Sequence, residues 1–153
     1  MDEMIVEERI EAPPDVLWAV ITNIENATDV ISGISVIERV DDGSGFDVGF
    51  TWRETRRMFG KDTTEEMQVV AVDDGRSYDV ESDSHGTRYF STTSVLPDGD
   101  GCVLRMAFRG EAQNTLSKVM GATLGRLFEG PTRRAIQQDL RDIAAEAQRR
   151  AQS

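Results

Sequence analysis

The sequence has little material for redox or metal chemistry, because its 153 residues include one cysteine, Cys102, and one histidine, His85. A single cysteine cannot close a disulfide within the chain, and these two residues are too few for the common zinc and haem sites. We therefore expect neither a metal nor another cofactor. His85 is the first candidate for a general acid or base, although its neighbours predict an exposed hairpin tip. Cys102, at the start of a predicted strand, is expected to be inert.

Long apolar runs and basic residues are also scarce. No stretch approaches the roughly 20 consecutive apolar residues that span a bilayer, so we expect no membrane insertion. The start of the chain is acidic where a secretory signal is basic, which favours a cytoplasmic location. The 17 Lys and Arg residues against 28 Asp and Glu residues give a net charge of -11. A surface this negative repels phosphate groups, so we expect no nucleic-acid partner.

What the sequence does contain is the composition of an ordinary globular protein, with 39% hydrophobic and 29% charged residues. A chain of this length can bury a core without disulfides, and no linker or repeat divides it. We therefore expect residues 1–153 to form a single domain. A homodimer is compatible with the sequence, which does not decide the oligomeric state.

Two short helices are predicted between the first strand and the remaining strands. Apolar and polar residues alternate from Met4 to Glu11, which predicts a strand. Pro13-Pro14 ends it, and the apolar residues that follow recur at helical spacing. A second short helix is predicted from about Glu25 to Ile31.

Six strands are then predicted one after another. The clearest alternation is the stripe of Phe46, Val48, Phe50 and Trp52, which places these large apolar side chains on one face. Tight turns rich in Asp and Gly separate the strands and predict an antiparallel meander. The other predicted strands cover residues 34–40, 61–73, 76–84, 86–96 and 102–112.

A long C-terminal helix is predicted from about Asn114, because apolar residues recur at helical spacing almost to the chain end. Gly130-Pro131 predicts a kink or a brief break in this helix. An antiparallel sheet and an amphipathic helix each have one face to bury, so we expect an α+β fold in which they cover each other. A curved sheet cannot close flat on a rigid helix, which predicts an apolar cavity between them.

Four short segments, in a fixed order along the chain, carry a resemblance to a known family. They are Ile10–Trp18, Val72–Tyr78, Asp100–Leu104 and Leu124–Pro131. In these segments, and over nearly its whole length, the chain resembles the helix-grip proteins related to START domains, plant pollen allergens and bacterial polyketide cyclases or aromatases. The resemblance implies a seven-stranded curved antiparallel sheet wrapped around the C-terminal helix, with an apolar cavity. It does not choose among carriers, enzymes and regulators.

The candidate cavity-lining residues are the large side chains that face inward on the strands or on the helix stripe. Plain core packing is the alternative for each of them, because methionine and aromatic side chains suit both roles. The predicted ligand-binding residues are Phe50, Trp52, Met67, Tyr78, Tyr89, Met106, Phe108, Met120, Leu124 and Phe128.

Two of the predicted strands leave their inward face open, because a shift of one residue reverses every side chain. On residues 61–73, Met67 and Val69 compete with Val70 and Val72. On residues 86–96 we favour the set containing Tyr89, because a tyrosine hydroxyl in an apolar pocket would orient a ligand. The two sets on that strand are Phe90, Thr92 and Ser94, if Leu96 pairs with Cys102, or Tyr89, Ser91, Thr93 and Val95, if the loop is one residue shorter.

Glu54, Arg56 and Arg57 are predicted to lie in a loop at the cavity mouth, where an arginine could hold a carboxylate or enolate. Solvated loop charges are the alternative. No polar set inside the cavity is recognisable, which argues against catalysis. We therefore predict a carrier or sensor of a small hydrophobic or aromatic metabolite. The alternatives are a polyketide cyclase, aromatase or dehydratase acting in the same cavity through Tyr89, Arg57 or His85, and a regulatory module that binds a partner protein.

Overall fold

The computed structural model describes residues 3–58, 60–84, 86–112 and 115–153, apart from the side chains of Met58 and of residues 115–128. The elements follow the predicted order, except that the second short helix is divided into a 3-10 turn and one turn of α-helix. They are β1 (Met4–Ile10), α1 (Pro14–Thr22), η1 (Ile24–Asn26), α2 (Ala27–Val30), β2 (Ile34–Arg39), β3 (Thr51–Met58), β4 (Lys61–Asp73), β5 (Ser77–Ser84), β6 (Thr87–Asp98), β7 (Gly101–Ala112) and α3 (Thr115–Ala151).

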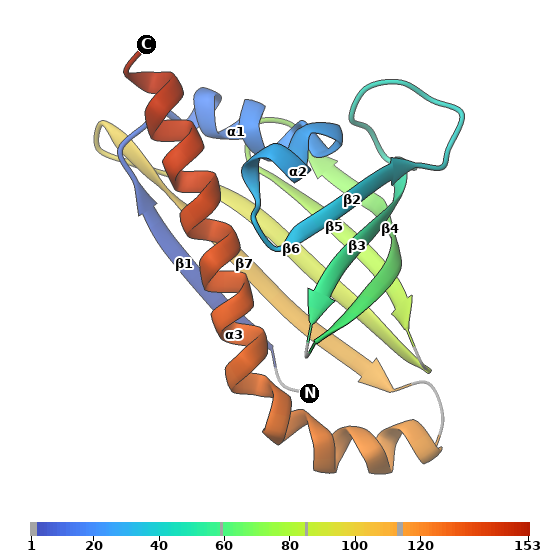
Figure 1. Cartoon of the computed structure of the whole chain (residues 1–153). Helices are drawn as coiled ribbons and strands as arrows, with labels where there is room; N and C mark the ends of the chain where they lie inside the picture. Colours follow the sequence, from blue (N-terminus) through green and yellow to red (C-terminus); the bar gives the residue numbers. More distant parts are fainter. Residues whose placement is uncertain (1–2, 59, 85, 113–114) are drawn as a thin grey trace.

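All strands belong to one 7-stranded antiparallel sheet in the order β1-β7-β6-β5-β4-β3-β2. The sheet is twisted and curved, α3 runs across its concave side, and α1 and α2 lie at one end (Figure 1). Helix α3 packs against α1 and, among the strands, chiefly against β1 and β7 at one edge of the sheet. The predicted α+β helix-grip architecture is therefore confirmed.

Helix α3 is one continuous α-helix through Pro131, so the predicted break is absent, whereas the predicted bend is visible (Figure 1). Proline removes one backbone hydrogen bond and crowds the preceding turn, which here bends the helix without ending it. The second half of the helix, residues 129–151, contributes its apolar stripe to the core. That stripe consists of Ile136, Leu140, Ile143, Ala144 and Ala147, none more than 8% exposed.

The turn between β6 and β7 decides which side chains of β6 face inward. Asp98 pairs with Gly101, so residues 99–100 alone form the turn. A turn this short belongs to the register that points Tyr89 toward the concave face. The favoured register is confirmed by the burial of two members of the same set, Thr93 and Val95.

A β-bulge decides which side chains of β4 face inward. Between Val69 and Ala71 the pairing with β5 shifts by one residue, and Val70 is the extra residue. Because such a shift reverses the alternation, Val69 and Val72 both contribute to the core. Val70 lies on the convex face instead. The inward set is thus Met67, Val69 and Val72, which neither of the two predicted sets contains in full.

The residues before β3 form a loop, so the predicted strand from Phe46 to Trp52 is wrong before Thr51, although Phe46 still packs against the core. Strand β3 begins only at Thr51. Gly49 has a φ of +98°, a conformation that interrupts a strand and that favours glycine. Val48 is 62% exposed, whereas Phe50 and Trp52 are buried as expected.

Asp41 holds this loop of residues 40–50 in place. Its carboxylate accepts hydrogen bonds from the backbone N–H groups of Thr51 and Gly43, each at 2.9 Å, and from Arg39 at 3.0 Å. The bond from Thr51, followed by that from Arg39, lowers the pKa of Asp41 to about 2. The loop therefore delivers Phe50 and the start of β3 in a fixed position.

The bulge generates a prediction about two neighbouring valines. Val69→Ala removes carbon atoms from a fully buried position, so we expect the free energy of unfolding to fall by about 2 kcal/mol. Val70→Ala makes the same chemical change on the convex face, where we expect a loss of less than about 1 kcal/mol. Urea denaturation of both variants measures the difference. Equal losses would show that the pairing does not shift at Val70.

Candidate functional site

The concave face of the sheet has a closed half, where α1 and the second half of α3 pack on it. In this half the inward side chains of Val69 and Leu104 are 0% exposed and that of Val95 is 3% exposed. Leu17 of α1 and Leu140 of α3 belong to the same apolar cluster, and both are also 0% exposed. The closed half is therefore tightly packed core.

Three of the predicted ligand-binding residues, Phe50, Trp52 and Tyr78, lie in an aromatic cluster of this core. The rings of Phe50 and Trp52 meet edge to face at 5.3 Å between centroids, and Phe46 contacts Tyr78 at 4.8 Å. The Tyr78 hydroxyl donates a hydrogen bond to the carbonyl of Ile21 at 3.3 Å. Burial raises the pKa of Tyr78 to about 12, so the phenol is protonated at neutral pH. The role of these residues toward a ligand stays a prediction.

The open half of the concave face is defined by Met67, Tyr89, Met106 and Phe108. These side chains face the helix side of the sheet and yet are only partly buried. The rings of Tyr89 and Phe108 stack at 5.5 Å with an angle of 12° between their planes. These inward side chains are therefore less completely buried than those of the closed half. The predictions outside the described side chains are Met120, Leu124, Phe128 and His85.

A largely buried ionic cluster joins β3 to α3. Arg56 donates two hydrogen bonds to the carboxylate of Asp139, at 3.1 and 2.7 Å, and one to Glu54 at 2.6 Å. The Trp52 indole N–H donates to the other oxygen of Glu54 at 3.3 Å. The side chains of Glu54 and Asp139 are 11% and 10% exposed. With two carboxylates and one guanidinium, the cluster carries an excess of negative charge.

The prediction that Glu54, Arg56 and Arg57 lie in a loop is wrong, because all three belong to β3. The alternation continues from Trp52 through Glu54 to Arg56 on the concave face. Only Arg57 points to solvent, with its side chain 70% exposed beside Asp62. The failure to recognise inward polar groups has the same cause, since charged residues at inward positions interrupt the expected apolar pattern.

Burial and the neighbouring charges shift the pKa values of Asp139 and Arg56 in opposite directions. Burial raises the pKa of Asp139, against the hydrogen bonds and positive charge of Arg56. Burial disfavours the charged form of Arg56 as well, but its bonds to Asp139 and the charge of Glu54 outweigh burial and raise the pKa of Arg56. Arg56 is therefore a permanent cation that two protein carboxylates already neutralise.

Further polar groups lie on the open half. Glu65 of β4 is directly opposite Glu54 of β3. Ser82 of β5 lies between Met67 and Tyr89 in the strand pairing. It is 7% exposed, and among the described residues its hydroxyl has no hydrogen-bond partner. Burial raises the pKa of Tyr89, and the negative charge of Glu65 adds to this rise.

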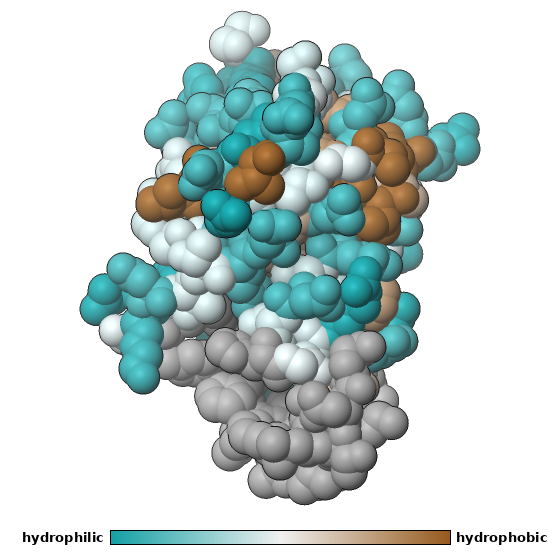
Figure 2. Space-filling view, turned by 90° about the vertical axis from the view of Figure 1, so that its right-hand side faces the viewer, coloured by the Kyte–Doolittle hydropathy of each residue, from teal (hydrophilic) through white to brown (hydrophobic). Residues whose placement is uncertain are grey.

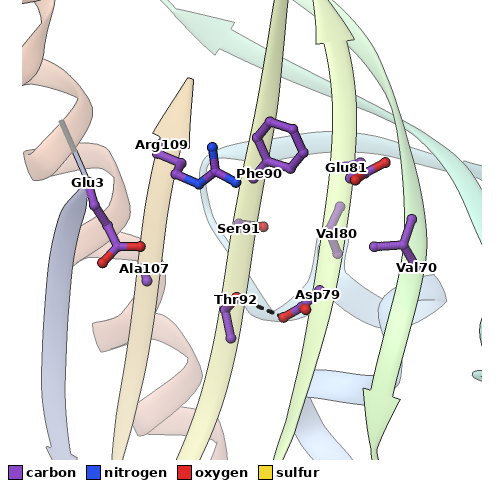
Figure 3. Close-up of a pocket in the computed structure, with 10 residues that line it drawn as sticks. All are labelled: Glu3, Val70, Asp79, Val80, Glu81, Phe90, Ser91, Thr92, Ala107 and Arg109. Carbon is purple, nitrogen blue, oxygen red and sulfur yellow. Dashed lines mark hydrogen bonds between the residues drawn. The ribbon is translucent and has the colours of Figure 1, made fainter. Parts of the chain in front are cut away.

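The convex face carries a shallow hollow over β4 to β7, shown in Figure 3. Its volume is about 130 Å³, below the roughly 300–1,000 Å³ of typical ligand pockets. Thr92 donates a hydrogen bond to Asp79 at 2.7 Å, and the Arg109 guanidinium lies 4.1 Å from the centre of the Phe90 ring. Since these side chains are engaged with one another, we place the candidate site on the concave face.

The side of the molecule that carries the loop of residues 40–50 is mostly polar in the part that the structure describes. Hydrophilic side chains cover most of this part, and apolar ones form separate patches (Figure 2). Val36 of β2 and Val48 of the loop are 51% and 62% exposed. Scattered apolar residues of this kind are ordinary on a protein surface.

The fold and the site geometry accompany a match to a protein family. The family model described as polyketide cyclase / dehydrase and lipid transport matches residues 1–148. The chain belongs to this family. The description of the polyketide cyclase/dehydrase family covers both chemical conversion and lipid transport, so membership alone does not choose between them.

Solved structures agree with the family assignment. An aromatase/cyclase from a Streptomyces species has a TM-score of 0.76 at 16% identity, covering 97% of this chain and 94% of that one. A protein from Thermus thermophilus has a TM-score of 0.75 at 19% identity, covering 95% and 97%. Norcoclaurine synthase from Thalictrum flavum, in complex with dopamine and hydroxybenzaldehyde, has a TM-score of 0.66 at 19% identity, covering 94% and 84%. At these identities the likeness establishes the fold.

No curated protein matches the chain. None of the described helices combines the length and the apolar character of a membrane-spanning segment. Within the described residues, no group of three His, Cys, Asp or Glu side chains is placed to hold a metal ion.

The ionic cluster generates a prediction about the anchoring of α3. Asp139→Asn leaves the buried Arg56 guanidinium with one carboxylate, so we expect the free energy of unfolding to fall by about 3 kcal/mol. The matched control is Asp142→Asn, where a half-buried carboxylate without an ion-pair partner among the described residues accepts hydrogen bonds from Ser32. For that variant we expect a loss of about 1 kcal/mol or less. Urea denaturation measures both, and small equal losses would contradict the anchoring role of Asp139.

The unpartnered hydroxyl of Ser82 generates a second prediction. Ser82→Ala removes a buried polar group that has no described partner, so we expect the free energy of unfolding to rise by about 1 kcal/mol. Thr92→Val is the control, because it breaks the hydrogen bond to Asp79 and should destabilise the protein by about 1 kcal/mol. Thermal denaturation compares the two. A loss of stability in Ser82→Ala would show that the hydroxyl is bonded in the free protein.

Proposed function

We propose that the chain binds a small apolar or aromatic molecule between the open half of the concave face and α3. The observation that carries this proposal is the partial exposure of Met67, Met106 and Phe108, which face the helix side of the sheet. In a packed core, inward side chains at such positions are inaccessible to water. A ligand that completed their burial would gain roughly 25 cal/mol for each Å² of apolar surface removed from water.

Four further findings support a ligand of this kind. The family description includes lipid transport, and the norcoclaurine synthase structure holds dopamine and hydroxybenzaldehyde. The Tyr89 ring, stacked on Phe108, offers a flat wall against which an aromatic ring can lie. The net charge of -11 works against ligands rich in phosphate.

A second candidate function is cyclase or dehydratase chemistry on a molecule held in the same place. The specific observation in its favour is a carboxylate, Glu65, and a phenol, Tyr89, on the open half, since both groups can act as general acid or base. Mass spectrometry of polyketide-like compounds after incubation with the protein separates the two functions. Recovery of changed compounds favours the enzyme, and recovery of unchanged, bound compounds favours the carrier.

The binding proposal predicts the response of two adjacent residues on β7. A ligand present at about 100 times its Kd stabilises a protein by about 2.7 kcal/mol, which for a chain of this size raises Tm by about 5–10 °C. We expect such a shift for at least one compound in a panel of fatty acids, polyketides and aromatic molecules. Met106→Lys places a charge on the open half and should abolish the shift. Ala107→Lys points to the convex face and should retain it.

Two results from the same panel would contradict the binding proposal. A flat response of the unmodified protein would do so, and so would equal shifts in the two lysine variants. Native mass spectrometry of the purified protein gives an independent readout, because it detects a small molecule that remains bound.

A further inference from the structure

The concave face carries an excess of acidic side chains where β3 and β4 pair. Glu54 and Glu65 are directly opposite each other, and like charges at opposed positions destabilise a sheet. Arg56 compensates part of this charge, but Glu54 shares it with Asp139. Negative charge therefore remains at this end of the face.

Two other basic side chains of the described strands lie on this face, Arg39 of β2 and Lys61 at the start of β4. The Arg39 guanidinium pairs with Asp41 and Glu25 and lies 4.1 Å from the centre of the Phe50 ring. These contacts hold Arg39 beside the loop of residues 40–50. Lys61 lies four residues before Glu65 on β4 and is exposed, and in the part of the chain that the structure describes no ion pair joins it or any other cation to Glu65.

An independent observation at the same place is the buried hydroxyl of Ser82. Its strand β5 lies between β4, which carries Glu65, and β6, which carries Tyr89. Ser82 shares the concave face with Tyr78 and Val80, because the three alternate along β5 and are all at most 8% exposed. A buried hydroxyl without a described partner is rare in folded proteins and indicates a group that the free protein does not supply.

We propose that Glu65, Ser82 and Tyr89 form a subsite for the protonated amino group of a ligand whose apolar body lies against Met67 and Phe108. This amine subsite rests on the proposed function, because it assigns the chemical class of the ligand that occupies the open half. The strand pairing places the three polar side chains on successive strands β4, β5 and β6. The two apolar side chains lie on the same face of β4 and β7.

A primary ammonium group matches the chemistry of these three side chains. It supplies the positive charge that Glu65 lacks, and it has three N–H donors for the oxygens of Glu65, Ser82 and Tyr89. A ligand carboxylate would instead meet the acidic excess of the face. A neutral alcohol would satisfy Ser82 and leave the charge of Glu65 uncompensated. The net charge of -11 also attracts cations to the protein.

Three probes with one ring system test the amine subsite. Naphthylethylamine, naphthylethanol and naphthylacetic acid present the same apolar body with a cationic, a neutral and an anionic end group. Isothermal titration calorimetry at neutral pH and low salt measures their affinities. We expect the amine to bind about tenfold more tightly than the alcohol, and the acid to bind most weakly.

Adjacent glutamates on β4 provide the matched variants. Glu65→Gln keeps the shape of the side chain and removes its charge, so it should weaken binding of the amine about tenfold and leave the alcohol unchanged. Glu66→Gln is the control, because Glu66 faces the convex side and lies 3.6 Å from Arg53. It should leave all three affinities unchanged. Ser82→Ala should weaken the amine about threefold in a protein that remains folded.

The outcomes separate the amine subsite from the proposed function. If the unmodified protein binds the amine and the alcohol equally, or if the preference persists in Glu65→Gln, the subsite is wrong and apolar binding stands. If none of the three probes binds, the subsite is wrong as well. The panel of fatty acids, polyketides and aromatic molecules then decides the proposed function by itself, through the difference between Met106→Lys and Ala107→Lys.

Discussion

Arg56 of β3 and Asp139 of α3 meet through two hydrogen bonds that bridge the concave side of the sheet. The helix packs against β1 and β7 at one edge, and this ion pair ties it to β3 near the other edge. One helical turn further on, Asp142 accepts two hydrogen bonds from Ser32, which adds a second tie on the same side. The helix is thus attached near both edges of the sheet.

The polar nature of this tie matters for the site. Charged groups lose hydration when they are buried, so an ion pair of this kind adds less net stability than its bonds suggest. Its hydrogen bonds are directional, however, and we infer that they fix the distance between α3 and β3. Glu54 completes the arrangement by orienting Arg56 and receiving the Trp52 indole N–H. Strand β3 therefore contacts the packed core through Trp52 and the open half through Glu54, which is opposite Glu65.

Periodicity made the order of elements and the length of the last helix predictable from the sequence. It left both β6 registers open, and the correct one was favoured because the Tyr89 hydroxyl would orient a ligand. The bulge at Val70 was not predictable, because it depends on how two strands pair rather than on the residues of one strand. The ionic cluster was missed for a similar reason, since Arg56 and Asp139 are 83 positions apart. Of the open half, the inward direction of Met106 and Phe108 was predicted, whereas Glu65 and Ser82 carry no local signal that separates them from surface residues.

Several hydrogen bonds attach residues 133–148 of α3 to the rest of the chain. The hydrogen bonds that the structure describes between this helix and the rest of the chain run from Arg133, which donates to the carbonyl of Ile5, to Gln148, which accepts from the N–H of Glu11. All of them follow the bend at Pro131. None of these hydrogen bonds involves Met67, Met106 or Phe108. Substitutions at these three positions can therefore change the surface offered to a ligand while the bonds between α3 and the rest of the chain remain.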